Sequence, residues 1–179
     1  MEFIQSVDEK VLTLLSGIFK NAFFDTILPY ITLLGEYGLV FIICTLFLSA
    51  YKPTRRIGET CAVSMIFDFI SCNLILKNIV MRTRPDKSFW NQHIIIPPHD
   101  WSFPSGHAAI SFAFAVAIFC YDKKWGTATL VCAVLISFSR IYLCVHWFSD
   151  VIIGMFLGTA CALLANLIVK SIYKKYNLV

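Results

Sequence analysis

The segment VIIGMFLGTACALLANLIV occupies residues 151–169 and contains no Asp, Glu, Lys or Arg. A helix of about 20 apolar residues is long enough to cross the roughly 30 Å hydrocarbon core of a bilayer. This stretch therefore predicts a membrane-spanning helix, and similar apolar runs precede it. The expected spans lie near residues 31–50, 58–78, 104–121, 126–144 and 147–169.

The composition of the whole chain agrees with these runs. Hydrophobic residues make up 58% of the 179 residues and charged residues only 15%, whereas an ordinary soluble domain has about 25% charged residues. No internal repeat, linker or low-complexity tract divides the sequence. We therefore expect one membrane-embedded domain over residues 1–179, an all-α polytopic helical bundle of five to six transmembrane helices.

The sequence of residues 1–30 is compatible with two structures. Five apolar residues fall on one face at helical spacing, namely Val7, Val11, Leu14, Leu15 and Ile18. Four residues then interrupt the apolar pattern: Lys20, Asn21, Asp25 and Pro29. The stretch is a sixth, imperfect span or a set of amphipathic helices lying in the membrane interface, and the interruptions favour the interfacial arrangement. The charges at Asp8, Glu9 and Lys10 do not fit a cleavable signal peptide.

Charge and cysteine content exclude other classes of protein. The net charge is +4, and the basic residues sit at the ends of apolar runs instead of forming a basic face, so we expect no nucleic-acid partner. The seven cysteines have no paired spacing and are interpreted as small packing residues. We expect no metal, no other cofactor and no obligate protein partner. The expected partners are the bilayer and its lipids.

The basic connectors also predict an orientation. Lys and Arg are enriched in cytoplasmic loops, and with five spans starting at residue 31 one set of basic residues falls on a single side. These residues are Lys52, Arg55, Arg56, Lys123, Lys124, Lys170, Lys174 and Lys175. The opposite side, which receives the long loop 81–103, should then face outward.

Three short strings of charged and reactive residues lie at the outward ends of these spans. In the first, Lys77 is followed seven residues later by Arg84 and then by Pro85. If the helix continues, this spacing is about two turns or roughly 10 Å, which lets both cations converge on one anion. A structural alternative is a cluster of basic side chains that snorkel at a helix end.

The second string is Pro104-Ser105-Gly106-His107, at the start of an apolar run. Ser105 and Gly106 would place a hydroxyl and free amides at the positive end of a helix, which favours phosphate binding. His107 titrates in the range that suits proton transfer. The alternative is an ordinary helix start with a histidine at the interface.

The third string joins Ser139-Arg140 at the end of one span to His146 and Asp150 at the start of the next. The spacing of His146 and Asp150 predicts one helical face, where the carboxylate would accept a proton from one ring nitrogen and leave the other free. Arg140 would neutralise charge on phosphoryl oxygens. The alternative is a purely structural His–Asp pair.

Taken together, the three strings resemble the full three-part signature of the type 2 phosphatidic acid phosphatase (lipid phosphate phosphatase) family. The resemblance covers residues 77–150, and every defining position is filled. It implies a helical membrane bundle with a metal-independent phosphatase site that faces outward. It also implies that His146 is the nucleophile that forms a phosphohistidine, that Asp150 orients His146, and that His107 protonates the leaving oxygen. The implied phosphate-binding residues are Lys77, Arg84, Ser105, Gly106 and Arg140.

The resemblance leaves the substrate open between several phospholipid and isoprenoid phosphates. The small size resembles that of bacterial members, so we expect an integral protein of a bacterial inner membrane and place undecaprenyl diphosphate first. Phosphatidylglycerol phosphate, phosphatidate and lipid A phosphate are the alternatives. Outside this class, an anion transporter would place its ionisable groups near the midplane, and a non-catalytic relative would usually lack a nucleophile or an acid.

Four features outside the signature carry separate expectations. Asp68 is expected to bond a neighbouring helix, since a buried acid in a span is costly. Gly154 and Gly158 predict close helix packing. Cys144 stands where this family more often has glycine. The loop 86–103 is interpreted as an interfacial connector or as a selector of the lipid head group, and it holds Phe89, Trp90, His93, His99, Asp100 and Trp101.

Overall fold

A computed structural model describes residues 2–18, 21–86 and 100–177 of the chain. Helices make up its ordered elements, in the order α1 (Glu2–Ile18), α2 (Ala22–Leu33), η1 (Glu36–Gly38), α3 (Leu39–Ala50), η2 (Lys52–Thr54), α4 (Arg55–Asp68), η3 (Phe69–Leu76), α5 (Lys77–Val80), α6 (Gly106–Phe119), α7 (Lys123–Tyr142) and α8 (Phe148–Lys175). The all-α class is confirmed, and strands are absent from the described ranges.

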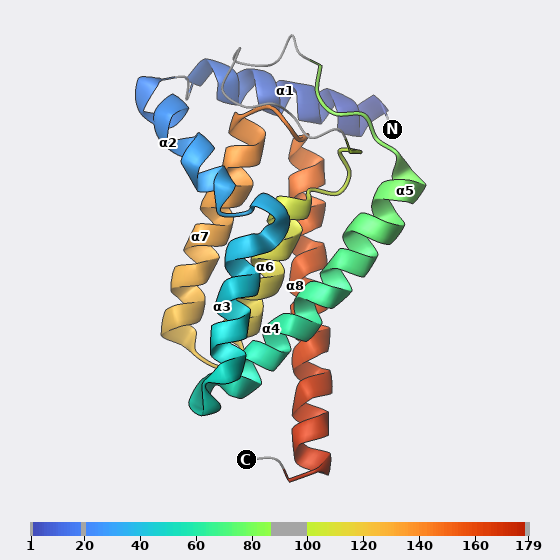
Figure 1. The fold of residues 1–179 in the computed structure, drawn as a ribbon. Helices are drawn as coiled ribbons and strands as arrows, with labels where there is room; N and C mark the ends of the chain where they lie inside the picture. The colour runs from blue at the N-terminus through green and yellow to red at the C-terminus, as the bar shows by residue number, and fades with distance from the viewer. Residues whose placement is uncertain (1, 19–20, 87–99, 178–179) are drawn as a thin grey trace.

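The long helices run alongside one another as a bundle with two distinct ends (Figure 1). At one end lie the end of α5, the start of α6 and the connection from α7 to α8. At the other end lie the α3–α4 turn, the α6–α7 turn and the C-terminus. The basic connectors named above belong to this second end, so the two ends differ in charge as well as in connectivity.

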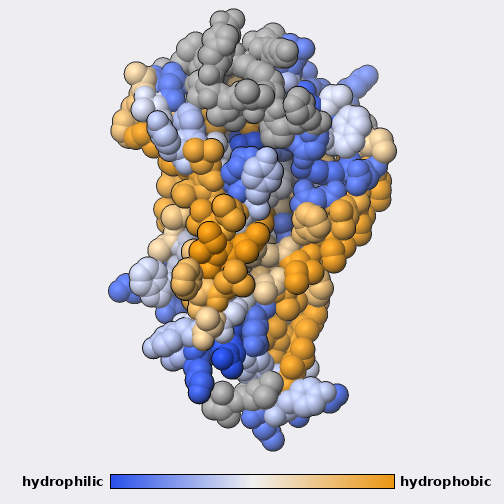
Figure 2. Space-filling view, viewed as in Figure 1, coloured by the Kyte–Doolittle hydropathy of each residue, from blue (hydrophilic) through white to orange (hydrophobic). Residues whose placement is uncertain are grey.

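A hydrophobic band surrounds the middle of the face drawn in Figure 2, and hydrophilic side chains gather at both ends. Four helical stretches are long and apolar enough to cross a membrane: Ala22–Ala50, Lys52–Val80, Lys123–Tyr142 and Phe148–Lys175. The predicted span 104–121 is shorter, because α6 has 14 residues, or about 21 Å of helix. These features support an integral membrane protein.

Helix α6 forms the centre of the bundle, packed between α7 and α8. Most of its residues are buried, and its alanines allow neighbouring helices to approach. A Cβ atom on Gly158 would lie 2.0 Å from the carbonyl oxygen of Ala109, and one on Gly154 would lie 2.7 Å from that of Ser105. The two glycines therefore let α8 touch the α6 backbone, which confirms the predicted close packing.

The predicted span 31–50 is interrupted at its start. Helix α2 ends at Leu33, and the chain passes through η1 before α3 begins. Tyr37 and Gly38 adopt left-handed conformations there, with φ values of 50° and 66°. Glycine adopts such angles without steric cost, and the break brings Glu36 to the end of the bundle that holds the start of α6.

Helix α1 lies across that same end of the bundle, over α7 and α8 (Figure 1). This orientation agrees with the interfacial alternative for the N-terminal region. The predicted apolar face is not the most buried side of this helix, since Leu14 and Ile18 are 58% and 64% exposed. The fully buried residues are Asp8 and Leu12, which the predicted face did not include. Apolar side chains on the outer face suit contact with lipid.

The second span ends close to the expected residue 78, but its helix does not continue to Arg84. Helix α4 passes into the π-helical segment η3, and helical structure stops at Val80, four residues before Arg84. Met81 turns the chain with a left-handed φ of 48°, and residues 81–86 are not helical. The two-turn spacing of Lys77 and Arg84, which required the helix to continue, therefore does not apply, although both side chains still reach one site.

Candidate active site

A pocket of about 660 Å³ opens at the end of the bundle where α6 begins. All three sequence strings contribute to its wall. The charged and polar lining residues are Thr32, Glu36, Asn73, Lys77, Arg84, Asp100, His107, Arg140 and His146. Ser105 and Asp150 lie fully buried behind this wall, and Gly106 lines it directly. The structure thus brings together every residue that the signature singled out.

The first string supplies two cations, which share one carboxylate. Lys77 donates a hydrogen bond to Oδ2 of Asp100, and Arg84 donates to Oδ1 over 2.6 Å. Burial alone would raise the pKa of Asp100, but the hydrogen bonds and charges of Lys77 and Arg84 outweigh it and hold the pKa at about 2. An anion with two oxygens therefore already sits between these cations.

His146 is 2% exposed and lies in the connection between α7 and α8. Its Nε2 atom is 3.1 Å from Nη1 of Arg84. Because a guanidinium can only donate, this contact assigns a lone pair to Nε2 and the proton to Nδ1. Burial, with the positive charges of Arg84 and Arg140, holds the pKa of His146 well below its ordinary value of 6.5. The imidazole is therefore neutral, with Nε2 available to react.

Asp150 does not bond His146 directly, which corrects the expected pair. The distance from Nδ1 of His146 to Oδ2 of Asp150 is 3.8 Å, too long for a hydrogen bond. The hydroxyl of Ser102 lies between them, 3.4 Å from Nδ1, and donates to Oδ2 of Asp150. The contact from His146 to Asp150 thus runs through Ser102, which the sequence analysis did not identify.

The physical reason is the position of the helix start. Helix α8 begins at Phe148, so His146 precedes it and the four-residue helical spacing does not apply. Asp150 instead caps the helix by accepting a hydrogen bond of 3.1 Å from the Trp147 amide. Ser102 stands two residues before Pro104, outside the second string, and no pattern in the sequence pointed to its place between His146 and Asp150.

The N-terminus of α6 borders the same site. The Ser105 hydroxyl is buried and has no hydrogen-bond partner among the described residues. A Cβ atom on Gly106 would lie 3.9 Å from Nζ of Lys77, so the helix start adjoins the cation. An unpaired hydroxyl and a helix N-terminus beside fixed positive charge suit a phosphoryl group.

His107 and Arg140 complete the wall from the other side. Nε2 of His107 lies 3.5 Å from a carboxylate oxygen of Glu36, without the geometry of a hydrogen bond. Arg140 is 2% exposed and donates to the Thr32 hydroxyl over 2.6 Å, which leaves its Nε atom unpaired among the described residues. Neither Glu36 nor Thr32 was predicted, because both precede the signature and lie beside the break between α2 and α3.

Two of the remaining expectations can be compared with the structure. Cys144 has a left-handed φ of 52°, which explains why glycine suits this position. Asp68 is buried, and its Oδ1 atom has no hydrogen-bond partner among the described residues, so the expected bond to a neighbouring helix is not seen for that oxygen. All seven cysteines are free, as predicted.

The structure describes only part of the loop 86–103. Asp100 belongs to the site, and Trp101 is 40% exposed beside it in the sequence. Phe89, Trp90, His93 and His99 lie outside the described residues. The choice between a connector and a selector of head groups therefore stays a prediction.

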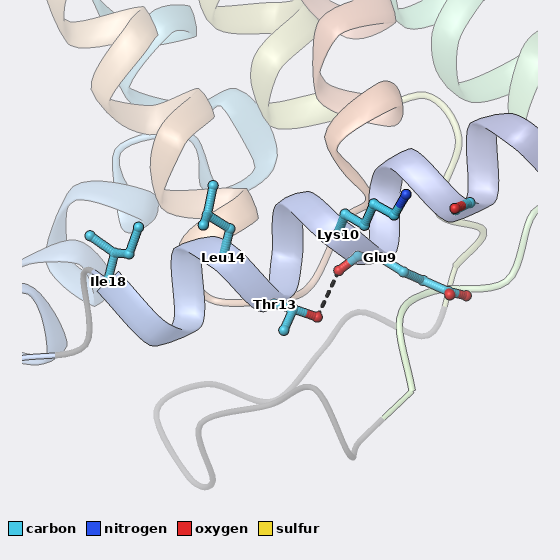
Figure 3. A pocket seen from close by; sticks show the side chains of 6 residues that line it. Glu9, Lys10, Thr13, Leu14 and Ile18 are labelled. Atoms are coloured by element: carbon cyan, nitrogen blue, oxygen red, sulfur yellow. Dashed lines mark hydrogen bonds between the residues drawn. The ribbon is translucent and has the colours of Figure 1, made fainter.

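A second hollow, of about 590 Å³, lies along α1 (Figure 3). Its lining residues are Ser6, Glu9, Lys10, Thr13, Leu14 and Ile18. Thr13 donates to the carbonyl oxygen of Glu9 within the same helix. The lining combines one acid, one base and apolar side chains of a single helix, which gives no set of groups for catalysis.

Comparison with known proteins gives a consistent result. The family model described as the PAP2 superfamily matches residues 57–174. An undecaprenyl-diphosphatase from Sulfolobus acidocaldarius is 36% identical over 130 residues, which cover 70% of this chain and 63% of that relative. This chain thus spans less than two thirds of that relative. A lipid A 4'-phosphatase from Bacteroides thetaiotaomicron is 26% identical and covers 88% of this chain and 75% of its own length.

A solved structure resembles the whole bundle. It is the crystal structure of a transmembrane PAP2-type phosphatidylglycerolphosphate phosphatase from Bacillus subtilis, with 27% sequence identity and a TM-score of 0.74. The superposition covers 98% of this chain and 88% of that one. The likeness therefore extends to α1 and α2, beyond the residues that the family model matches.

Proposed function

The chain belongs to the PAP2 superfamily, and we propose that it is a lipid phosphatase that removes a phosphate group through a phosphohistidine intermediate on His146. One observation carries this proposal. Arg84 binds the Asp100 carboxylate with one nitrogen and faces the lone pair of His146 Nε2 with another. A phosphoryl group that took the place of the carboxylate would therefore lie against the nucleophile.

In the first step, Nε2 of His146 attacks the phosphorus atom and the bond to the lipid oxygen breaks. His107 gives its proton to that leaving oxygen. Lys77, Arg84 and Arg140 balance the charge of the equatorial oxygens, and such electrostatic stabilisation is usually the largest part of catalysis. The Ser105 hydroxyl and the amides at the start of α6 bind the same oxygens. Ser102 and Asp150 hold the imidazole with its proton on Nδ1.

In the second step, water attacks the phosphohistidine, and His107 now accepts a proton from that water. The bond between nitrogen and phosphorus breaks, inorganic phosphate leaves and His146 regains its lone pair. The charges in this scheme come from side chains, so we propose a reaction without a metal ion. The substrate enters from the bilayer, and the site faces outward from the cytoplasm.

Undecaprenyl diphosphate is the proposed substrate, supported by the relative from Sulfolobus acidocaldarius. The leaving group would then be the lipid monophosphate. Phosphatidylglycerol phosphate is the second candidate, supported by the similarity of the whole bundle to the Bacillus subtilis phosphatase. Both substrates join a phosphate to a long apolar chain, which agrees with a pocket at the rim of a hydrophobic band.

Phosphate release from detergent-purified protein tests the function. The panel contains undecaprenyl diphosphate, phosphatidylglycerol phosphate, phosphatidate and lipid A, each in EDTA, with wild type beside His146→Ala. We expect release from at least one lipid, no release from the variant and inhibition by vanadate, which mimics five-coordinate phosphorus. Release that survives in folded His146→Ala, or that EDTA abolishes and a divalent cation restores, contradicts the mechanism.

A further inference from the structure

Arg82 connects the N-terminal helix to the buried carboxylate behind His146. Its Nη2 atom donates to Oδ2 of Asp8 on α1 over 2.6 Å, and its Nη1 atom donates to Oδ1 of Asp150 on α8 over 2.7 Å. The planar guanidinium can bind two acceptors at once in a fixed geometry. Arg82 thus fixes the distance between Asp8 and Asp150.

The burial of these groups makes the connection specific. The side chains of Asp8 and Asp150 are 1% and 0% exposed, and that of Arg82 is 19% exposed. A carboxylate out of water is costly unless it is paired and hydrogen-bonded. Asp8 gains two further hydrogen bonds from Ser149, 2.8 Å from the amide and 2.6 Å from the hydroxyl. The start of α8 is therefore bound to α1 in two ways, through Arg82 and directly from Ser149 to Asp8.

The local chain geometry sets Arg82 in this position. The left-handed turn at Met81 ends α5 directly before it. The carbonyl oxygen of Arg82 then accepts a hydrogen bond of 2.8 Å from the Ser102 amide, and its guanidinium lies 5.2 Å from the centre of the Trp147 ring. Arg82 therefore contacts both residues that position His146. Its carbonyl oxygen binds the backbone of Ser102, and its guanidinium binds the carboxylate of Asp150.

Resting on the proposed function, we propose that Arg82 and Asp8 are positioning residues for the reaction. The pair holds Asp150 in the orientation that Ser102 and His146 require, which makes α1 part of the catalytic apparatus. Neither residue lines the pocket, so their effect on the reaction is indirect. Misplacing a reacting group by about 1 Å costs roughly a hundredfold in rate.

Steady-state kinetics of Asp8→Asn and Arg82→Lys in detergent test this proposal. Asp8→Asn keeps the size of the side chain and removes the charge, while Arg82→Lys keeps the charge and removes the second arm of the fork. We expect kcat to fall roughly tenfold to a hundredfold in each, as for supporting residues elsewhere, with KM within twofold of wild type. The double variant should lose no more than the worse single variant, because both changes break one connection.

The control is Glu2→Gln, which removes a negative charge from the first turn of α1, where the side chain is exposed. It should leave kcat and KM unchanged. A melting temperature for each variant separates loss of catalysis from loss of fold, since a merely structural role would lower the melting temperature and leave kcat of the folded fraction intact.

Three outcomes overturn the inference. The first is wild-type kcat in folded Asp8→Asn and Arg82→Lys. The second is a loss that appears only in KM, and the third is additive losses in the double variant. An inactive wild type in the same assay instead contradicts the proposed function and removes the reaction that the inference needs, so the two failures are distinguishable.

Discussion

Ser102 lies between His146 and Asp150, where it accepts from one and donates to the other. In Ser102→Ala the imidazole loses the hydroxyl that connects its Nδ1 atom to Asp150, so the ring is held less firmly. We expect kcat to fall roughly tenfold to a hundredfold, the usual range for a residue that orients a functional histidine. Phosphate release at saturating substrate measures it.

Ser137→Ala is the matched control for that change. Ser137 is also a buried serine, and its hydroxyl has no hydrogen-bond partner among the described residues. Its removal should leave kcat unchanged. An equal loss of activity in both variants would show that buried hydroxyls matter for packing in general and would contradict a specific role of Ser102.

Asp100 binds two of the three cations proposed to bind phosphoryl oxygens, Lys77 and Arg84, so it competes with a bound phosphate. Asp100→Asn removes the competing charge, and we expect vanadate to inhibit the variant at a roughly tenfold lower concentration, a difference of about 1.4 kcal/mol. Inhibition titrations of the two proteins measure it. Weaker inhibition of the variant would mean that the carboxylate holds Lys77 and Arg84 in place for the substrate.

The pH dependence of this effect follows from the lowered pKa of Asp100. With a folded-state pKa of about 2 against an ordinary value of 3.8, the carboxylate stabilises the fold fully above pH 3.8 and loses that effect as the pH falls toward 2. Asp100 therefore stays ionised from pH 5 to pH 8. The ratio of vanadate affinities between Asp100→Asn and wild type should stay constant across that range.

At the scale of helices, contact between α6 and α8 fixes the second and third strings relative to each other. Gly158 allows this contact, because its Cβ position is 2.0 Å from a backbone oxygen that cannot turn aside. Gly158→Ala must separate the helices, and overpacking of this kind costs about 1–3 kcal/mol. We expect a lower melting temperature in detergent, whereas the control Ala160→Val, on an exposed position of the same helix, should change it little.

Helix packing of this kind could be predicted from the sequence, because small residues at a spacing of four define one face. The end of the second span, expected near residue 78, was also close to the observed end at Val80. The path of the chain from there to Arg84 could not be predicted, because it depends on the π-helical segment Phe69–Leu76 and on the left-handed conformation of Met81. Neither a π-helix nor a left-handed methionine has a strong sequence pattern, since tertiary contacts impose both.

The same distinction explains which residues of the site could be predicted from the sequence. His107, Arg140 and His146 could be predicted to converge because each lies at a helix end on one side of the bundle. Asp8, Glu36 and Thr32 could not, because none of them belongs to the signature. Asp8 lies on α1 and the other two lie beside the break between α2 and α3, and long-range contacts place both segments against the site. Asp8 appeared as an acid in an amphipathic helix, and only its burial against Arg82 and Ser149 reveals its contacts.

At the scale of the whole molecule, the start of α6 and the basic connectors lie at opposite ends of the bundle (Figure 1), and the pocket is lined by residues at the start of α6. Basic residues are retained on the cytoplasmic side, so this separation predicts a pocket that opens outward. Single cysteines at Trp101 and Lys124, introduced in a variant without the seven native cysteines, test the prediction in intact cells with a membrane-impermeant maleimide. Trp101→Cys should react in intact cells.

Lys124→Cys should react only after the cells are permeabilised, because Lys123 and Lys124 begin α7 at the basic end of the bundle. The reverse pattern would place the pocket on the cytoplasmic side, and the substrate would then have to be a phosphate displayed on the inner leaflet. Labelling at both positions in intact cells would mean a mixed orientation. The sidedness of the molecule therefore decides which pool of lipid phosphates the enzyme can reach, independently of the chemistry at His146.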